Sequence, residues 1–521
     1  MSSPQIAPGE IPPPTPATQN RVLRGLIIRD QDSSKDASHH IPVQRDNGDE
    51  ARYADKSGTY TKGVKQQSVG IVDPVAYASF RKALNSGADA DFGKIIVGGG
   101  PRKLNGPQGG LAFNLDCLEN SQFFVPPAPA LHSEEYAAEL IELYWASLLR
   151  DVPFIQYPTN SLAQQAATEL TKLGNAYQGP RTAKTVTPEI LFRGGFSGEL
   201  DGPYLSQFLL QETSMGALKI VQQYNTAAPY VDYMKDAATF LDVQNGANPP
   251  ADPPGPPLYL FNGRGLASYT HVDILYQAYF TAYLILSTLN NLNSGNPYIK
   301  SATQNGFGTF GAPDPASALA AVASAALKAV WYQKWFIHLR HRPESGGALV
   351  YLQNTPSAQQ AQGKVSDTVL KSAAVAASLS ANKSYFLSQA FPEGSPVHPA
   401  YPTGHGTVAG ACITVLKFFF DGKATFPANK VLVPTADGSM PTQTYSGADL
   451  TVNGELNKLA SNISFGHGIH GGIHWRSDTV TSIQLGEEVA LSFLHDHART
   501  YNEKFKVEIE RVDGSLATIS N

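Results

Sequence analysis

The feature that most constrains the fold of this 521-residue chain is a series of helical segments that begins near residue 130. Ser133 can cap a helix whose first turn carries Glu134 and Glu135 and whose apolar residues recur at helical spacing. Pro- and Gly-rich loops separate the later segments, and strand patterns are few and short. Helices are predicted at 161–174, 215–242, 264–293, 315–341, 365–380, 406–421, 452–464 and 476–497. The sequence therefore predicts an all-α fold of bundled helices with long Pro/Gly-rich loops, in one domain over residues 71–521.

The first part of the chain has a different composition. Residues 1–70 are rich in Pro, Ser, Asp, Lys and Gln and lack apolar periodicity. We expect an extended or disordered arm, which wraps a neighbouring subunit or the protein's own surface if it is ordered. No apolar core of a signal peptide is visible after Met1, and no apolar run reaches transmembrane length. These features favour a soluble, cytoplasmic protein.

Charge and cysteine content exclude some partners. The net charge is -5, and Lys and Arg form no block along the chain. Nucleic acid and anionic membranes are therefore poor candidates for partners. Cys117 and Cys412 lie far apart in the sequence, and Cys412 falls in an apolar helical run. We expect a buried, reduced thiol rather than a disulfide.

The segment from His398 to His405 (His-Pro-Ala-Tyr-Pro-Thr-Gly-His) precedes a strongly apolar helical run. Backbone N–H groups at a helix start are unpaired, and the helix dipole favours negative charge there. Thr403, Gly404 and His405 can therefore offer a hydroxyl, an amide and an imidazole to one small oxyanion. The alternative is a proline-rich loop before a capped helix, with His398 and His405 as ordinary loop residues.

A second candidate is the pair of cations in segment 331–344, which is otherwise rich in aromatic residues. On one continuous helix, Lys334 and Arg342 would project within about 80° of each other. Two cations on one edge suit an anion better than a core. The alternative is a solvated helix face on which the aliphatic stems of both side chains cover apolar surface.

Segment 465–478 carries three histidines, His467, His470 and His474, among four glycines. This spacing is not a standard zinc pattern, and no carboxylate or cysteine lies at ligand spacing. Structural roles for His467 and His470 are the competing interpretation. Asp478 follows His474 by four residues, so on a helix it could hold Arg476 or orient a neighbouring group.

Taken in order, the three segments resemble the vanadium-dependent haloperoxidases and the related acid phosphatases. The resemblance rests on Lys-x7-Arg-Pro, on Pro-Thr-Gly-His in place of Pro-Ser-Gly-His, and on a histidine followed by an aromatic residue and arginine. It implies two four-helix bundles flanking the site, and a homo-oligomer built from dimers, a dodecamer in red algae. The oligomer number and the family's structural calcium site stay undecided for this chain. Stretches that resemble red-algal and cyanobacterial bromoperoxidases are 113–116, 191–194, 202–208, 262–269 and 454–460.

The resemblance implies a vanadate cofactor held as an oxyanion with one bond to an imidazole nitrogen. The matching residue is His474, which would be the one metal ligand. Lys334, Arg342, the Thr403 hydroxyl and the Gly404 amide would neutralise and orient the remaining oxygens through charge-assisted hydrogen bonds.

The same resemblance implies the reaction, in which hydrogen peroxide and a halide give hypohalous acid that halogenates a small organic substrate. His405 would be the acid–base group, and Lys334 would polarise the peroxide. His398 matches a position that is histidine in bromoperoxidases and phenylalanine in the fungal chloroperoxidases, which favours bromide. The alternative for His398 is simple packing in its loop.

Two positions depart from the family pattern. Thr403 replaces a serine and keeps the hydroxyl. Gly468 stands where the family has an arginine, six residues before His474; in the red-algal register the arginine position falls on His467, with one residue inserted. Loss of such a clamp costs about 2–4 kcal/mol of binding free energy. We hypothesise that protonated His467 or His470 replaces the arginine, so that vanadate binding weakens as the pH rises through the imidazole pKa.

Two other functions use the same pocket. A phosphatase would form a phosphohistidine at His474 while His405 protonates the leaving group. An oxyanion-binding relative would have weakened activity because the third basic clamp is missing. The long bromoperoxidase-like match outside the pocket favours the haloperoxidase.

Overall fold

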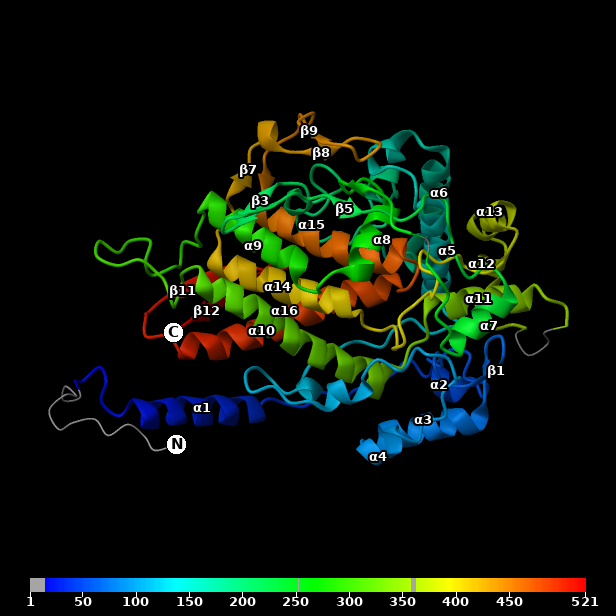
Figure 1. Ribbon diagram of the computed structural model, residues 1–521, viewed down its shortest axis with the longest axis horizontal. Coiled ribbons are helices and arrows are strands. Elements are labelled where there is room, and N and C mark those ends of the chain that lie inside the picture. The colour runs from blue at the N-terminus through cyan, green and yellow to red at the C-terminus, as the bar shows by residue number, and fades with distance from the viewer. Residues whose placement is uncertain (1–14, 252, 358–361) are drawn as a thin grey trace.

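The computed structural model describes residues 15–251, 253–357 and 362–521, which are mostly helical (Figure 1). The prediction of an all-α protein built from helical bundles is confirmed. The helices are α1 (Arg21–Ala37), α2 (Asp49–Arg52), α3 (Pro74–Ser86), α4 (Asp89–Phe92), α5 (Glu134–Leu149), α6 (Ser161–Lys172), α7 (Ala237–Gln244), α8 (Gly263–Val272), α9 (Gln277–Leu289), α10 (Pro313–Tyr332), α11 (Pro343–Gln353), α12 (Asp367–Leu370), α13 (Ala373–Asn382), α14 (Gly404–Phe419), α15 (Val452–Phe465) and α16 (Arg476–Arg499).

Short antiparallel ribbons of two strands decorate the loops. The longest is a C-terminal hairpin whose inward residues Val507 and Ile509 are buried. The pairs within the described residues are β1 (Gln66–Ser68) with β2 (Ile71–Val72), β3 (Thr213–Met215) with β4 (Leu218–Ile220), β5 (Tyr224–Asn225) with β6 (Pro257–Leu258), β7 (Thr425–Phe426) with β10 (Leu450–Thr451), β8 (Val433–Pro434) with β9 (Pro441–Thr442), and β11 (Lys506–Glu510) with β12 (Leu516–Ser520).

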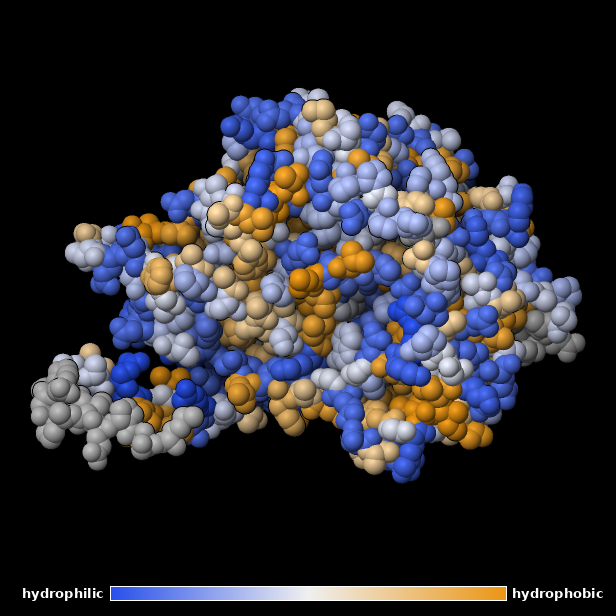
Figure 2. Space-filling model, in the orientation of Figure 1, coloured by the Kyte–Doolittle hydropathy of each residue, from blue (hydrophilic) through white to orange (hydrophobic). Residues whose placement is uncertain are grey.

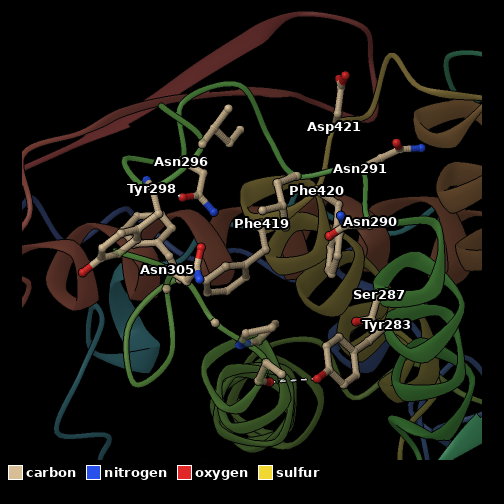
Figure 3. Close-up of a pocket in the computed structure, with 17 residues that line it drawn as sticks. Tyr283, Ser287, Asn290, Asn291, Asn296, Tyr298, Asn305, Phe419, Phe420 and Asp421 are labelled. Carbon is tan, nitrogen blue, oxygen red and sulfur yellow. Dashed lines mark hydrogen bonds between the residues drawn. The ribbon is translucent and has the colours of Figure 1, made fainter. Parts of the chain in front are cut away.

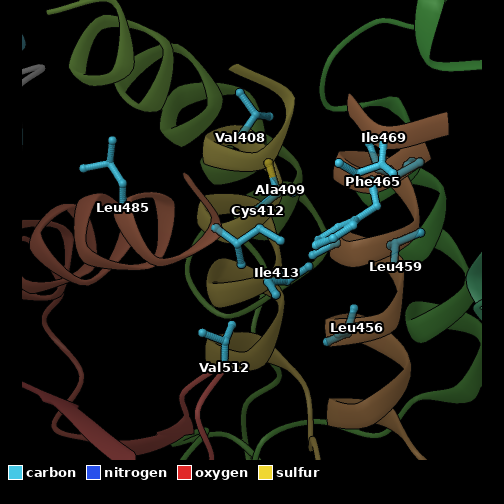
Figure 4. Close-up of a cluster of buried hydrophobic side chains, with 14 of the residues drawn as sticks. Val408, Ala409, Cys412, Ile413, Leu456, Leu459, Phe465, Ile469, Leu485 and Val512 are labelled. Atoms are coloured by element: carbon cyan, nitrogen blue, oxygen red, sulfur yellow. The ribbon is translucent and has the colours of Figure 1, made fainter. Parts of the chain in front are cut away.

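The centre of the molecule is a bundle of α10, α14, α15 and α16, which run side by side in Figure 1. Every residue of α14 except His405 is buried, because apolar or small side chains cover all of its faces. Figure 4 shows Cys412 and Ile413 of α14 between Leu459 of α15 and Leu485 of α16. This packing fixes the direction in which the first turn of α14 points.

Two glycines bring α14 and α16 unusually close together. A Cβ atom on Gly410 would lie 1.9 Å from the carbonyl oxygen of Ile483, and one on Gly486 would lie 2.0 Å from that of Thr407. The close approach places the first turns of both helices side by side, where the backbone N–H of Thr403 donates to the carbonyl of Asp478 at 3.2 Å.

Gly410→Ala should therefore lower the free energy of unfolding by about 3 kcal/mol. The added methyl group would collide with the backbone of α16, which cannot move away without disturbing the packing of both helices. Urea denaturation followed by circular dichroism measures the change. Gly308→Ala is the matched control, since no described atom lies within 4 Å of its added Cβ. Equal stability of the two variants would contradict the close approach of α14 and α16.

A second group of helices surrounds α5, which packs against α6, α11, α12 and α13. The hydroxyl of Ser133 caps α5 as predicted, accepting from the N–H of Tyr136 at 3.1 Å. Two buried carboxylates of α5 face the central bundle: Glu139 binds Arg340, and Glu142 binds Arg476. These ion pairs join the second group to the segments that carry the site.

Two predicted helices are broken in the structure. Residues 215–242 contain the end of β3, the strands β4 and β5, and only the short helix α7, because Gly216 and Pro229 interrupt the helical pattern. Residues 264–293 divide into α8 and α9, which meet at an angle of 101° around Asp273. The bend exposes the end of α8 and turns Asp273 toward the site described below.

The predicted N-terminal arm contains a helix, and its later part packs on the protein's own surface, as expected of an arm that is ordered; residues 1–14 lie outside the described residues. Residues 21–37 form the helix α1. Tyr60 and Val64 are buried with Phe80 against Trp335. Lys62 is buried as well, and its Nζ donates to Glu344 Oε1 at 2.7 Å. The polar composition of this segment did not reveal that it is ordered, because its buried polar groups are paired with partners distant in the sequence.

Two smaller expectations concern the cysteines and membranes. Within the described chain Cys117 and Cys412 are both free and buried, which confirms the reduced thiol expected at Cys412. Among the described residues no single helix is long and apolar enough to cross a membrane, and only α8 and α9 together pass such a test, as a pair bent by 101°.

Candidate active site

The three predicted segments meet around one cavity of about 400 Å³ at the first turn of α14. A larger cavity of about 690 Å³ lies at the other end of α14, beside Asn296, Asn305 and Phe419 (Figure 3). Its described lining contains no residue that the sequence assigned to the site. The residues of the smaller cavity used below are Trp331, His398, Gly404, His405, His467 and His474.

Lys334 and Arg342 lie directly behind this cavity but not on one continuous helix. After α10 the chain makes a π-helical turn over Gln333–His338, and Leu339 takes a left-handed conformation with φ of 43°. Lys334 lies in the π turn, whereas Arg342 precedes α11, where Pro343 occupies the first helical position. The predicted alignment along one helix is therefore wrong, although the tight turn still brings both cations to the same place.

Both cations are buried without a compensating carboxylate. Lys334 is 0% exposed, and its Nζ donates to the carbonyls of Pro399 at 2.9 Å and Ala400 at 2.8 Å. Burial, reinforced by Arg342, lowers the pKa of Lys334 well below its usual value. Burial also lowers the pKa of Arg342 to about 10. Among the described residues neither side chain forms an ion pair, so an anion is the missing partner that this arrangement favours.

The first turn of α14 supplies uncharged donors to the same place. Thr403 is the residue before the helix and Gly404 is its first residue, whose N–H belongs to the unpaired N-terminal amides. Thr403 is fully buried, yet its hydroxyl does not cap the helix and finds no hydrogen-bond partner among the described residues. A buried hydroxyl without a partner is costly, which again indicates a ligand.

His474 has a defined tautomer. Arg342 Nη1 lies 2.8 Å from His474 Nε2, and Asp478 Oδ2 lies 2.9 Å from His474 Nδ1. Because a guanidinium only donates, Nε2 is the acceptor, so the ring proton is on Nδ1 and is donated to Asp478. Burial, then the charge of Arg342, lowers the pKa of His474 well below its usual value. In this structure the neutral ring accepts from Arg342 at Nε2, and a metal bond at that nitrogen would replace the hydrogen bond.

Asp478 in turn is held by Arg340, whose Nη1 donates to Asp478 Oδ1 at 2.7 Å. Arg340 also pairs with Glu139 of α5. The sequence indicated that Asp478 could orient a neighbouring group or hold Arg476. In the structure Asp478 contacts His474 and Arg340, while Arg476 pairs with Glu142.

His405 forms a second imidazole–carboxylate pair in the lining of the same cavity. Its Nε2 lies 2.9 Å from Asp273 Oδ1, so Nε2 carries the proton toward the carboxylate and Nδ1 is the remaining ring nitrogen. Asp273 was not among the residues predicted for the site. Asp273 is the only acidic residue between 265 and 289, and this could have drawn attention to it. The continuous helix predicted over 264–293 gave no reason to place it at the site.

His398 lies beside Arg342 rather than free in its loop. Arg342 Nε donates to the carbonyl of His398 at 2.9 Å, and Arg342 Nη2 lies 3.0 Å from His398 Nδ1. The ring faces the indole of Trp331, with 4.8 Å between ring centroids. Burial, then the charge of Arg342, lowers the pKa of His398 well below its usual value. A neutral imidazole and an indole thus form one wall of the cavity.

Similarity to known proteins agrees with this arrangement. A family model described as the VCPO second helical-bundle domain matches residues 316–503. The vanadium-dependent bromoperoxidase of Corallina officinalis is 32% identical to the chain over 88% of its length and 90% of the relative. That of Ascophyllum nodosum is also 32% identical, over 89% of the chain and 86% of the relative. The chain belongs to the vanadium-dependent bromoperoxidases.

A solved structure extends the bromoperoxidase likeness to the whole fold. The homohexameric second vanadate-dependent bromoperoxidase of Ascophyllum nodosum superposes with a TM-score of 0.92 at 28% identity. The match covers 100% of this chain and 94% of that one. The fold that positions the cavity is therefore that of a bromoperoxidase throughout, including the segments before the family-model match.

The missing arginine of the bromoperoxidase pattern has a steric explanation at Gly468. A Cβ atom there would lie 2.8 Å from Thr479 Cγ2 and 3.0 Å from His474 Cβ, so a side chain does not fit. Gly466–His470 instead forms a π-helical turn. Such a turn accommodates one additional residue within a helix, which matches the insertion inferred from the red-algal register.

The π turn directs His467 into the cavity. Its ring stacks on His405 with 3.7 Å between centroids and lies 5.7 Å from the ring of His474. Its Nδ1 is buried and lacks a hydrogen-bond partner within the described chain. Burial, then the charge of His405, lowers the pKa of His467 well below its usual value. Without a bound oxyanion, burial therefore favours a neutral His467 ring that acts as a hydrogen-bonding group, and protonation of His467 on vanadate binding stays a hypothesis.

His470 points away from the cavity. Its Nε2 lies 3.2 Å from the hydroxyl of Tyr204, and its ring packs against Phe154 and Phe192. Burial lowers its pKa to about 3. The structural role that the sequence left open for His470 fits this position, and its proposed role as a replacement for the arginine does not.

The described residues offer no conventional cation site beside this cavity. Across residues 15–251, 253–357 and 362–521, no group of three or more His, Cys, Asp or Glu side chains is arranged to hold a metal ion. A vanadate site does not need one, because an oxyanion is held by cations and N–H or O–H donors around one imidazole. The residues behind the cavity match that requirement.

Proposed function

We propose that the chain catalyses the vanadate-dependent oxidation of bromide by hydrogen peroxide to hypobromous acid, which halogenates small organic substrates. The balance is H2O2 + Br− + H+ → HOBr + H2O. The observation that carries the proposal is the pair of buried, uncompensated cations, Lys334 and Arg342, beside the unpartnered hydroxyl of Thr403. That combination fits an oxyanion and no neutral ligand.

Each residue around the cavity receives a role in holding the cofactor. His474 would bind through Nε2, while Lys334 and Arg342 would balance the negative charge. The Thr403 hydroxyl and the Gly404 N–H would donate hydrogen bonds. When bound, vanadate supplies Lewis-acid activation of hydrogen peroxide toward attack by a halide.

Proton transfer falls to His405. Since Nε2–H is directed at Asp273, Nδ1 is the atom that takes a proton from hydrogen peroxide and returns one to the oxygen that leaves as water. Asp273 keeps the ring oriented and stabilises its protonated form. Lys334 Nζ is the cationic donor that would polarise the peroxide.

Bromide is the halide we assign. The wall formed by His398 and Trp331 is neutral, since burial lowers the pKa of His398. It supplies a hydrogen-bonding ring and a polarisable indole, which suit a large, weakly hydrated anion better than a small one. The match of His398 to the bromoperoxidase pattern supports the same assignment.

His467 is proposed as the substitute for the family's arginine, as a neutral donor. His467→Ala should weaken vanadate binding about 10-fold, the value of one neutral hydrogen bond. Equilibrium dialysis of the cofactor-free protein against vanadate measures the dissociation constant directly. His470→Ala is the control and should leave the constant unchanged, because His470 binds Tyr204 outside the cavity. Unchanged affinity in His467→Ala would show that this ring only packs on His405.

Paired assays separate the proposal from a phosphatase that forms a phosphohistidine at His474, which would use the same donors. The purified protein is incubated with vanadate, hydrogen peroxide and bromide, and bromination of a phenolic dye is followed. Hydrolysis of an aryl phosphate is then measured without vanadate. Bromination without hydrolysis supports the bromoperoxidase; hydrolysis without bromination overturns it; oxyanion binding with neither activity indicates a binding relative.

We also propose that the chain forms a homo-oligomer assembled from dimers. The support is the homohexameric state of the Ascophyllum nodosum protein, whose structure matches all of this chain. Light scattering during size-exclusion chromatography gives the mass of the assembly. A monomer at micromolar concentration would contradict this part of the proposal.

A further inference from the structure

The helix α1 (Arg21–Ala37) lies along the lower edge of the molecule in Figure 1, apart from the central bundle. In the described part of the chain none of its 17 residues is buried. Figure 2 shows hydrophobic atoms among hydrophilic ones over this helix. They belong to an apolar stripe in which Val22 is 91%, Leu23 55%, Leu26 61% and Ile27 43% exposed.

These four residues share one face of α1. The spacing i, i+1, i+4 and i+5 places them along a single stripe, as in a helix that packs against another surface. A stripe of large aliphatic side chains exposed to water is unfavourable for the free chain. Its helical pattern indicates a partner, whereas apolar residues scattered over a surface would need none.

The helix also lacks the local features that stabilise an isolated helix. Asn20, at its N-cap, has a left-handed conformation and makes no side-chain capping bond. The first turn contains no acidic residue and begins with Arg21, whose charge opposes the helix dipole. Gly25 lies in the interior, where it disfavours the helix. Helices of about this length are marginal in water, so the exposed half of α1 needs packing that the described residues do not supply.

Only the C-terminal half of α1 is fastened to the body among the described residues. Arg499 of α16 binds Asp32, with 2.7 Å between Nε and Oδ1. Arg499 Nη2 also donates to Gln31 at 3.2 Å, and Gln122 donates to the carbonyl of Asp36 at 2.7 Å. These contacts set the direction of the helix and leave its apolar N-terminal half free to reach another molecule.

We propose that α1 is an intersubunit element whose stripe of Val22, Leu23, Leu26 and Ile27 docks onto a second copy of this chain. A second copy is the occupant favoured here because the homohexameric relative superposes on 100% of the chain, α1 included. The inference rests on the homo-oligomer proposed above. It adds which segment makes the contact and which side chains become buried.

The test is the double variant Leu26→Asp, Ile27→Asp in the full-length chain, compared with the wild type by size-exclusion chromatography with light scattering. The charged stripe should raise the protein concentration needed for half-assembly at least 10-fold. Arg21→Asp is the control: it changes the net charge by the same -2, but Arg21 projects about 140° away from Leu26 and about 120° away from Ile27 on the helix. The control should assemble as the wild type does.

The outcomes separate this inference from the proposal beneath it. A monomeric wild type overturns the homo-oligomer itself. An oligomeric wild type with an equally stable Leu26→Asp, Ile27→Asp assembly overturns the role of α1. Hydrogen exchange of the wild type supplies a measurement that needs no variant. The amides of 21–29 should be protected in the assembly and should lose protection on dilution to monomer, and rapid exchange in the assembly would contradict the docking of α1.

Discussion

His474→Ala is expected to abolish vanadate-dependent bromination and to weaken vanadate binding by at least about 1000-fold. The ring of His474 is oriented by Asp478 at Nδ1 and by Arg342 at Nε2, and a bond from Nε2 to vanadium would replace the contact with Arg342. Alanine removes the bond to the cofactor and leaves the Asp478 carboxylate without one of its partners. Equilibrium dialysis with quantification of bound vanadium gives the affinity, and dye bromination gives the activity.

The comparison variant for His474→Ala is His470→Ala, which removes an equally buried imidazole from the same segment. His470 hydrogen-bonds to Tyr204 away from the cavity, so its loss should leave vanadate affinity within about 2-fold of the wild type. Wild-type affinity in folded His474→Ala protein would mean that another residue bonds the vanadium.

Lys334→Met should remove the stabilisation that vanadate gives to the wild type. A ligand at 100 times its dissociation constant stabilises the folded state by about 2.7 kcal/mol. Because Lys334 is fully buried without a carboxylate partner among the described residues, water screens its attraction to a bound oxyanion only weakly. Urea denaturation with and without vanadate measures the difference, which should fall to near zero in Lys334→Met.

Lys417→Met provides a matched control in the same helix bundle. Lys417 is 2% exposed and donates to Asn457 and to the carbonyl of Glu510, near the far end of α14 from the cavity. Its replacement should change the stability of the protein but keep the vanadate-induced gain. A full vanadate-induced gain in Lys334→Met would show that Lys334 does not face the anion.

The pH dependence of the cofactor-free protein follows from the same residue. Burial lowers the pKa of folded Lys334 below the 10.5 of an exposed lysine, so the unfolded chain binds the proton more tightly. Between the lowered folded pKa and 10.5, Lys334 therefore makes stability rise with pH. A bound oxyanion favours the charged lysine and opposes this trend.

Some residues of the site could be predicted from the sequence and others could not. The predictable ones are recognised by their side-chain chemistry, whereas the others reach the site only through tertiary packing. An oxyanion site was predictable where residue type and position near a helix start point to the same chemistry. This holds for Thr403, Gly404, His405 and His474. Asp273 escaped notice because its role arises from the 101° bend between α8 and α9, which local periodicity does not reveal.

The fold shows the same division. The helices of the central bundle were predictable because their apolar pattern runs the length of each element. The two π turns were not, since a single inserted residue leaves no periodic signal, yet they place Lys334 and His467. The burial of Lys62 depends on Glu344, 282 residues later in the chain, and no local pattern encodes such a pair.

The most direct measurement is a titration of vanadate into cofactor-free protein with bromination rate as the readout, at saturating hydrogen peroxide and bromide. A bromoperoxidase should be inactive without vanadate, and its rate should rise to a plateau at about one vanadate per chain, since one imidazole holds one vanadium. No bromination at any vanadate concentration, from protein shown to bind the oxyanion, would contradict the proposed function.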